Sequence, residues 1–398
     1  MFYKRQASLL FRGIRNIVKS RMEGSGKQQV YVTRADMPES GVELMRTECY
    51  VKQWNEPSPV PRSVFLKSVA GVNGIYCCLT DKIDKELLDA AGPQLKAIAT
   101  MSVGYDHIDV AECKKRGIKV GYTPDVLTDA TAELTVSFKT RYLDYVRSNL
   151  SHFGNKIYNT KRLLTNPGIV SACCCLLRTG LVHYYFFMAL LLATSRRLPE
   201  AQHEARTGGW KSWSPMWMTG PGLADSTVGI FGFGRIGQAV ASRVKAFNPR
   251  KILYYSRNER AAAKEIGACK VDFDDLLLDS DFVICCAALV PETRKIFNKP
   301  AFEKMKKTAV FINTSRGGTV DQDDLVDALK TKSIFAAGLD VTTPEPLPLD
   351  HPLLNMVNCI VLPHIGSATI EARKTMSELT AINILEALKG FPMPAELK

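Results

Sequence analysis

One short segment constrains this 398-residue chain more than any other, because an apolar run leads directly into three glycines. Residues 227–238 read TVGIFGFGRIGQ, which predicts a buried strand followed at once by a helix. The first glycine permits a tight turn, the second lets the backbone approach a phosphate, and the third lets the helix pack on the strand. We therefore expect a dinucleotide with its pyrophosphate at the helix N-terminus. The expected contacts in this loop are Gly232, Gly234, Arg235, Ile236 and Gly237.

The end of the next predicted strand, residues 251–256, indicates which dinucleotide fits. An acidic residue here would hydrogen-bond the ribose 2′-hydroxyl of NAD and repel a 2′-phosphate. The chain carries a hydroxyl and two cations instead, which favours NADP(H), although Glu259 lies among them and NAD(H) stays an alternative. The expected contacts in this segment are Ser256, Arg257, Asn258 and Arg260.

The net charge of +12 belongs to two segments of the chain. Residues 1–27 and 138–189 each carry seven Lys or Arg against one acid, so the remainder is neutral overall. A neutral main body gives no sign of a face that binds nucleic acid. The most apolar window, residues 181–193, is too short to span a membrane. The eleven cysteines include no CxxC pair, so we expect reduced thiols and no metal site.

The basic leader, residues 1–27, is expected to be disordered. Its Arg-rich start places Leu10, Ile14 and Ile17 on one helical face, as in a mitochondrial presequence. The competing interpretation is a dispensable leader with Met22 as an alternative start. We expect a cytoplasmic protein, or a mitochondrial one if the leader is a targeting peptide.

Strands alternate with helices in two series, which predicts α/β domains with parallel sheets. We expect two Rossmann-like, doubly wound domains with a cleft between them. Residues 28–126 and 370–398 form the expected substrate-binding domain, and residues 127–369 form the expected dinucleotide-binding domain. Helical apolar spacing over residues 371–388 predicts a C-terminal helix that returns to the first domain.

Three polar side chains each follow a predicted strand of the second series. Arg316 follows FINTS, Glu345 follows GLDVTTP, and His364 follows VLP. Open α/β sheets bind ligands at the carboxyl ends of their strands, so we expect these side chains to share one site. A guanidinium, a carboxylate and an imidazole together meet the needs of carbonyl reduction.

In this order, the motifs GFGRIG, SRG, GLDVTTPEP and PHIGSA resemble the D-isomer-specific 2-hydroxyacid dehydrogenase family. MSVGYDHID at residues 101–109 and GGWKSWSPMW at 208–217 resemble its glyoxylate/hydroxypyruvate reductases. The resemblance covers roughly residues 28–137 and 190–398. It implies a homodimer that reduces glyoxylate and hydroxypyruvate to glycolate and D-glycerate with NADPH.

The resemblance also implies roles for single residues. His364 would protonate the developing alkoxide, Glu345 would orient its imidazole, and Arg316 would bind the substrate carboxylate and polarise the carbonyl. The implied substrate contacts are Val103, Gly104, Arg316, Asp340, His364 and Trp213. The implied residues around the nicotinamide are Ala288, Thr314, Asp340 and Gly366.

Other functions stay open from sequence alone. An NAD-linked D-2-hydroxyacid dehydrogenase of other specificity is one alternative, and a corepressor-like binding protein of the same fold is another. Trp213 would either reach a partner's substrate pocket or pack at a subunit interface. A catalytically impaired isoform is a third alternative because of an insertion in the chain.

That insertion, residues 138–189, separates DATAELTVS from LLLATSRRLPEA, which run together as one helix in the family that the chain resembles. We expect a flexible excursion, lower solubility and reduced activity. Residues 186–189 could rebuild missing helical turns in front of Leu190.

Overall fold

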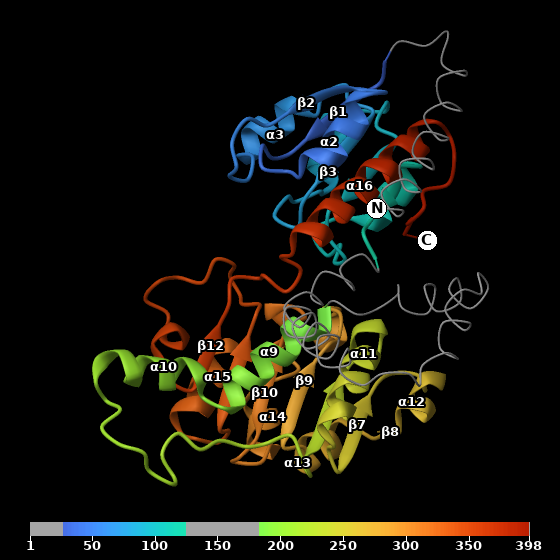
Figure 1. Ribbon diagram of the computed structural model, residues 1–398. Coiled ribbons are helices and arrows are strands. Elements are labelled where there is room, and N and C mark those ends of the chain that lie inside the picture. The colour runs from blue at the N-terminus through green and yellow to red at the C-terminus, as the bar shows by residue number, and fades with distance from the viewer. Residues whose placement is uncertain (1–26, 125–182, 398) are drawn as a thin grey trace, which may run out of the picture. The chain divides into compact units, whose positions relative to one another are not determined.

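The computed structural model describes residues 27–124 and 183–397 (Figure 1). The described residues form two compact units. Unit 1 comprises those of Met1–Tyr122 and Ser377–Lys398, and unit 2 those of Thr123–Met376. The leader and most of the insertion lie outside the described residues. Within the described ranges, no helix is long and apolar enough to cross a membrane.

Unit 1 contains a five-stranded sheet in the order β2-β1-β3-β4-β5, in which all neighbours are parallel. Its strands are β1 (Gln29–Val32), β2 (Tyr50–Gln53), β3 (Gly74–Cys77), β4 (Ala97–Thr100) and β5 (Lys119–Gly121). Its first helices are α2 (Glu39–Arg46), α3 (Arg62–Ser68), α4 (Lys85–Ala91) and α5 (Val110–Lys115). Ile75 and Ile98 are fully buried in one core cluster with Phe65 and Leu87, which attaches α3 and α4 to the sheet.

The C-terminal helix α16 (Ile370–Leu388) packs in unit 1 from Ser377 onward. The Tyr76 hydroxyl donates to Ser377 Oγ at 2.9 Å, and Asn383 Nδ2 donates to the Tyr122 carbonyl at 3.0 Å. A Cβ on Gly41 would lie 2.3 Å from the Ser377 carbonyl oxygen, so α2 and α16 approach as closely as glycine permits. The predicted return of the C-terminal helix to the first domain is confirmed.

Unit 2 contains a seven-stranded parallel sheet in the order β12-β11-β10-β9-β6-β7-β8. Its strands are β6 (Thr227–Phe231), β7 (Lys251–Tyr255), β8 (Ala268–Lys270), β9 (Phe282–Cys285), β10 (Val310–Asn313), β11 (Ala336–Leu339) and β12 (Cys359–Val361). Its helices are α9 (His183–Ser195), α10 (Leu198–Thr207), α11 (Arg235–Val244), α12 (Ala261–Ile266), α13 (Phe273–Asp279), α14 (Lys299–Lys304) and α15 (Gln322–Lys330). Short 3-10 turns occupy Lys245–Phe247, Pro291–Thr293, Gly317–Thr319 and Pro352–Asn355.

The strand order of unit 2 is the dinucleotide-binding order with one more strand at the edge. Successive strands run outward from β6 in one direction as far as β8 and then resume on its other side at β9. The direction of winding therefore reverses between β6 and β9, where such sheets bind ligands. The glycine loop follows β6 and so begins at this switch point.

Alternate residues of the unit 2 strands face two different cores. Phe311 and Val283 pack in one core with α13, α14 and α15, whereas Ile312 and Ile284 pack in the other with α9 and α11. Both faces of the sheet are thus covered by helices, and Figure 1 shows α9 and α11 running across its strands. This two-sided covering confirms the doubly wound α/β class predicted from the sequence.

The end of the insertion forms part of the unit 2 core. Helix α9 begins at His183, seven residues before the segment that resembles the family begins at Leu190. The side chains of Phe187 and Met188 are 1% and 5% exposed and join the same core cluster as Leu191. These residues therefore supply helical turns in front of Leu190, as the sequence suggested for residues 186–189.

Candidate active site

The glycine loop in unit 2 shows a separate structural reason for each of its three glycines. Gly232 has φ +94°, and a Cβ there would lie 2.6 Å from the Ala287 nitrogen. A Cβ on Gly237 would lie 2.1 Å from the Gly232 carbonyl oxygen. Gly234 instead faces open space at the start of α11, with nothing within 4 Å of its Cβ position. The backbone at Gly234 is therefore open to a close approach by a phosphate at the start of a helix, which fits a dinucleotide.

The segment after β7 carries the residues predicted to select the cofactor. Ser256 donates its hydroxyl proton to the Asn258 carbonyl at 2.5 Å, which folds the segment back on itself. Arg257 and Arg260 are exposed, and neither forms an ion pair with another described residue. The segment after this strand therefore presents two cations that no carboxylate of the described residues neutralises.

His364 and Glu345 form a hydrogen-bonded pair beyond the ends of β12 and β11. His364 Nδ1 lies 2.8 Å from Glu345 Oε2, and the other carboxylate oxygen accepts the Thr342 N–H at 3.1 Å. Burial raises the pKa of Glu345, but the hydrogen bond with His364 and its charge act in the opposite direction, and the net pKa lies below its usual value. An ionised carboxylate only accepts hydrogen bonds, so Nδ1 carries the proton and Nε2 remains for a substrate.

Asp340 holds the backbone of the segment that carries His364. Its carboxylate accepts the N–H of Ile365 and the N–H of Gly366, both at 2.9 Å, and its carbonyl accepts the His364 N–H at 3.0 Å. His364 itself has φ +53°, a region that side chains other than glycine seldom adopt. Burial raises the pKa of Asp340 to about 6 although both N–H groups act to lower it. Asp340 therefore stabilises a strained backbone beneath the imidazole.

Arg316 follows β10 in a turn that Asn313 organises. Asn313 Nδ2 donates to the Arg316 carbonyl at 3.1 Å, and its Oδ1 accepts the Ser315 N–H at 3.0 Å. The positive charge of Arg316 contributes to the lowered pKa of Glu345, so the two side chains interact electrostatically. The three predicted catalytic residues thus lie at one edge of the sheet. Asn313 and Thr342, which orient the site, were not predicted from the sequence. Their only signal in the sequence is that each is a polar residue at or near the end of a strand.

In unit 1, the turn after β4 contains Val103 and Gly104, both half-buried. Neither backbone N–H donates a hydrogen bond to any described residue. Two successive N–H groups without an acceptor at the carboxyl end of a strand suit a small anion.

Comparison with known proteins decides the family. The NAD-binding domain of D-isomer specific 2-hydroxyacid dehydrogenases matches residues 188–366. The glyoxylate reductase/hydroxypyruvate reductase of Homo sapiens is 48% identical over 372 residues, which cover 93% of this chain and 98% of the human protein. This chain belongs to the D-isomer-specific 2-hydroxyacid dehydrogenase family. It is accordingly an oxidoreductase that uses a nicotinamide cofactor.

Solved structures of the family show the same fold. A protein from Thermus thermophilus has a TM-score of 0.74 and 34% identity, covering 93% of this chain and 100% of its own. An NADPH-dependent glyoxylate/hydroxypyruvate reductase from Sinorhizobium meliloti, solved with NADP and malonate, has a TM-score of 0.69 and 27% identity. It covers 94% of this chain and 97% of its own.

Of the other predicted site residues, Arg235 and Ile236 begin α11, whereas Thr314, Ala288 and Trp213 lie on loops of unit 2. Thr314 follows β10, and Ala288 follows β9 with its carbonyl accepting the Thr293 hydroxyl at 2.7 Å. Trp213 is 81% exposed on the loop between α10 and β6. Trp210 and Met216 on the same loop are 62% and 77% exposed, so this loop presents apolar surface to solvent.

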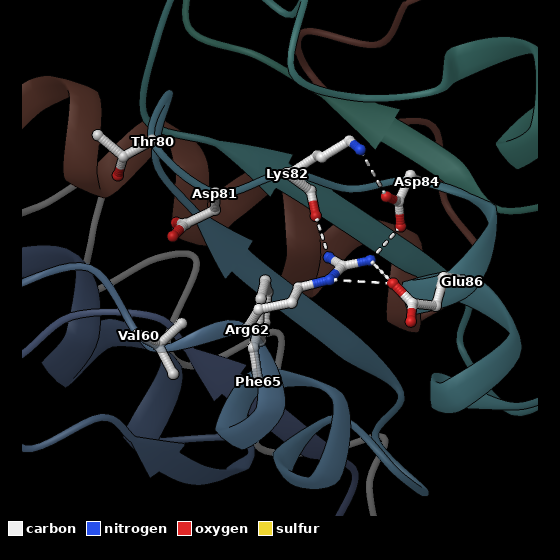
Figure 2. Close-up of a pocket in the computed structure, with 8 residues that line it drawn as sticks. All are labelled: Val60, Arg62, Phe65, Thr80, Asp81, Lys82, Asp84 and Glu86. Atoms are coloured by element: carbon white, nitrogen blue, oxygen red, sulfur yellow. Dashed lines mark hydrogen bonds and ion pairs between the residues drawn. The ribbon is translucent and has the colours of Figure 1, made fainter. Parts of the chain in front are cut away.

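A cavity of about 480 Å³ in unit 1 contains none of the predicted site residues (Figure 2). Figure 2 shows the Arg62 guanidinium directed at Asp84 and Glu86, with Nη2 2.7 Å from Glu86 Oε2. Arg62 Nη1 also donates to the Lys82 carbonyl at 2.8 Å. The cavity is lined by Val60, Arg62, Phe65, Thr80, Asp81, Lys82, Asp84 and Glu86. The guanidinium therefore already has acceptors within the chain and needs none from a ligand.

Proposed function

We propose that this protein reduces glyoxylate and hydroxypyruvate to glycolate and D-glycerate. The observation that carries the proposal is the 2.8 Å pair of His364 and Glu345 in the electrostatic field of Arg316. The 48% identity with the human glyoxylate reductase/hydroxypyruvate reductase supports the choice of substrates.

The three side chains have separate tasks in this reaction. A bound nicotinamide cofactor supplies a hydride to C2 of the 2-oxo acid. His364 gives the proton on Nε2 to the carbonyl oxygen, while the ionised Glu345 stabilises the imidazolium and fixes the ring. Arg316 binds the substrate carboxylate with two parallel N–H groups and polarises the carbonyl. In the reverse direction, His364 accepts the proton of the 2-hydroxyl group.

NADP(H) is the preferred cofactor in this proposal, with NAD(H) as the weaker one. Arg257 and Arg260 would pair with a 2′-phosphate, and Ser256 would hydrogen-bond it. The first turn of α11 would hold the pyrophosphate. The further contacts assigned to the cofactor are Gly232, Gly234, Arg235, Ile236, Gly237, Asn258, Ala288, Thr314, Asp340 and Gly366. Asp340 also positions the segment that carries His364, because its carboxylate accepts hydrogen bonds from two backbone N–H groups there.

The N–H groups of Val103 and Gly104 are assigned to the substrate carboxylate, which makes residues 28–126 and 370–398 the substrate-binding domain. The exposed loop with Trp213 is assigned to a homodimer interface, since burial of such a surface favours association. A cytoplasmic location, or a mitochondrial one if residues 1–27 are cleaved, stays a prediction. Imaging a tagged chain with and without these residues tests it.

Oxidation of NADPH and of NADH, followed separately with glyoxylate, hydroxypyruvate and pyruvate, tests the function and the cofactor. We expect glyoxylate and hydroxypyruvate to be preferred over pyruvate, and NADPH to be preferred by about tenfold, the effect of one charged hydrogen bond. Replacing Arg257 and Arg260 by Ala should remove the preference without changing kcat. Turnover of none of the three acids contradicts the function, whereas better turnover with NADH contradicts only the cofactor assignment.

A further inference from the structure

Two buried side chains and the half-buried His107 form a continuous hydrogen-bonded chain beside the turn with Val103 and Gly104. Ser102 Oγ lies 2.6 Å from the Gly104 carbonyl oxygen and 2.7 Å from Thr100 Oγ1. Thr100 Oγ1 lies 3.0 Å from His107 Nε2. Thr100 is fully buried and Ser102 is 5% exposed, so these groups satisfy one another rather than solvent.

Counting protons fixes the direction of every bond in this chain. Ser102 has one hydroxyl proton, and the Gly104 carbonyl can only accept it. Ser102 must therefore accept at its oxygen from Thr100, which uses the single proton of Thr100. Thr100 in turn accepts from His107, whose Nε2 must carry a proton. The result is an ordered relay from His107 through Thr100 and Ser102 to the Gly104 carbonyl, in which each bond strengthens the next.

The first two members of the relay, His107 and Thr100, are anchored to the sheet region of unit 1. The His107 carbonyl accepts the Ile83 N–H at 2.9 Å, and Thr100 is the last residue of β4. The ring of Tyr105 packs edge-on against Tyr122, with ring centroids 5.9 Å apart. Gly104, between these anchors, is the residue with the greatest backbone freedom, and the relay ends on its carbonyl.

We propose that Ser102 is a positioning residue for the substrate carboxylate. Its hydroxyl holds the Gly104 carbonyl, which belongs to the peptide between Gly104 and Tyr105, and so restricts backbone rotation at Gly104. The N–H groups of Val103 and Gly104, directly before this point, thereby stay oriented toward a bound carboxylate. This role rests on the proposed function, in which these N–H groups bind the substrate. Because every 2-oxo acid has the same carboxylate, the role does not depend on which acid is preferred.

The test compares Ser102→Ala with Ser226→Ala, a matched control in unit 2. Ser226 is 7% exposed and also donates its hydroxyl to a carbonyl, that of Leu223, at 2.6 Å. Ser102→Ala loses two hydrogen bonds and Ser226→Ala loses one, so both variants should lower Tm. Only Ser102→Ala should raise KM for glyoxylate and Kd for oxalate, by roughly 3- to 10-fold, with kcat and KM for NADPH unchanged. An unchanged KM and Kd in a folded Ser102→Ala variant overturns the proposal.

Two variants of Thr100 keep the test decisive if Ser102→Ala does not fold. Thr100→Val removes the hydroxyl group that donates to Ser102, with little change of shape, and should raise KM for glyoxylate. Thr100→Ser retains the hydroxyl group and should keep KM near the wild-type value. Equal KM values for the two variants contradict the relay. If the unaltered protein reduces no 2-oxo acid, the proposed function is contradicted. The Kd for oxalate still tests, in that case, whether Ser102 positions the turn for a carboxylate.

Discussion

The two units place different chemistry at the same kind of sheet edge. In unit 2 the segments after β10, β11 and β12 carry a guanidinium, a carboxylate and an imidazole. In unit 1 the turn after β4 offers two N–H groups, with neutral hydroxyls fixing its carbonyl. Charged side chains can move protons and polarise bonds, whereas backbone groups provide fixed dipoles. In the proposed reaction, unit 2 therefore supplies the proton transfer and the charged groups, and unit 1 supplies uncharged donors for the substrate carboxylate.

The largest expected effect is that of His364→Asn, which removes the proton donor. We expect kcat/KM for glyoxylate to fall by about 1,000-fold, in the range of general acid catalysis. Affinity for NADPH, measured by fluorescence titration, should remain within about twofold, because His364 is not among the predicted phosphate contacts. An equally large loss of kcat from Ser102→Ala would break the contrast between the two edges.

Glu345→Gln should have the next largest effect. The amide can still reach His364, but it cannot stabilise the imidazolium as a carboxylate does. We expect kcat to fall by roughly 100-fold, near the upper limit for a hydrogen bond to a charged group. Steady-state kinetics with saturating NADPH measures this. If kcat is retained, Glu345 has only a packing role.

Arg316→Lys distinguishes charge from geometry at the unit 2 edge. Lysine keeps the positive charge but lacks the planar pair of N–H groups that matches a carboxylate. We expect KM for glyoxylate to rise about tenfold and kcat to change less. An unchanged KM in this variant would mean that the unit 1 turn alone binds the carboxylate. The two sheet edges would then differ even more in their roles.

The smallest expected effect is a change in the pH dependence of stability on replacing Asp340. Its pKa rises from 3.8 to about 6 on folding, so the native state binds the proton more tightly than the unfolded chain. This stabilising contribution is complete below about pH 4 and is lost as the pH rises through about 6. Asp340→Asn should therefore flatten the decline of Tm between these pH values. Ser102→Ala should retain the wild-type pH dependence, and equal slopes for Asp340→Asn and wild type contradict the assignment.

Strong periodicity made part of the fold predictable. The apolar runs at β6, β7 and β10 and the C-terminal helix were expected near their observed bounds, because regular apolar patterns dominate local preference. The short strand β2, with the sequence YVKQ, was not predicted. Tyr50 is exposed and Gln53 is half-buried, so residue polarity does not follow exposure in this edge strand. Only pairing with β1 reveals it.

The candidate site divides in the same way. Arg316, Glu345 and His364 could be proposed from their chemical types and from their positions after strands. Three features could not be proposed from the sequence, because each depends on distances between atoms of a folded turn. They are the Ser102 relay, the Asn313 contacts and the two hydrogen bonds that Asp340 accepts from backbone N–H groups. Hydrogen bonds act over about 3 Å, and a sequence does not specify position to that precision.

By itself, the sequence determined the α/β class, the glycine loop and the three charged or ionisable side chains of the unit 2 edge. Periodicity and residue chemistry are local properties, so they are present before folding. Only the tertiary structure decided that Phe187 and Met188 complete a core helix, that Asp340 supports a strained His364, and that Ser102 directs its proton to Gly104. These depend on burial and on atomic proximity, which arise when distant segments pack together.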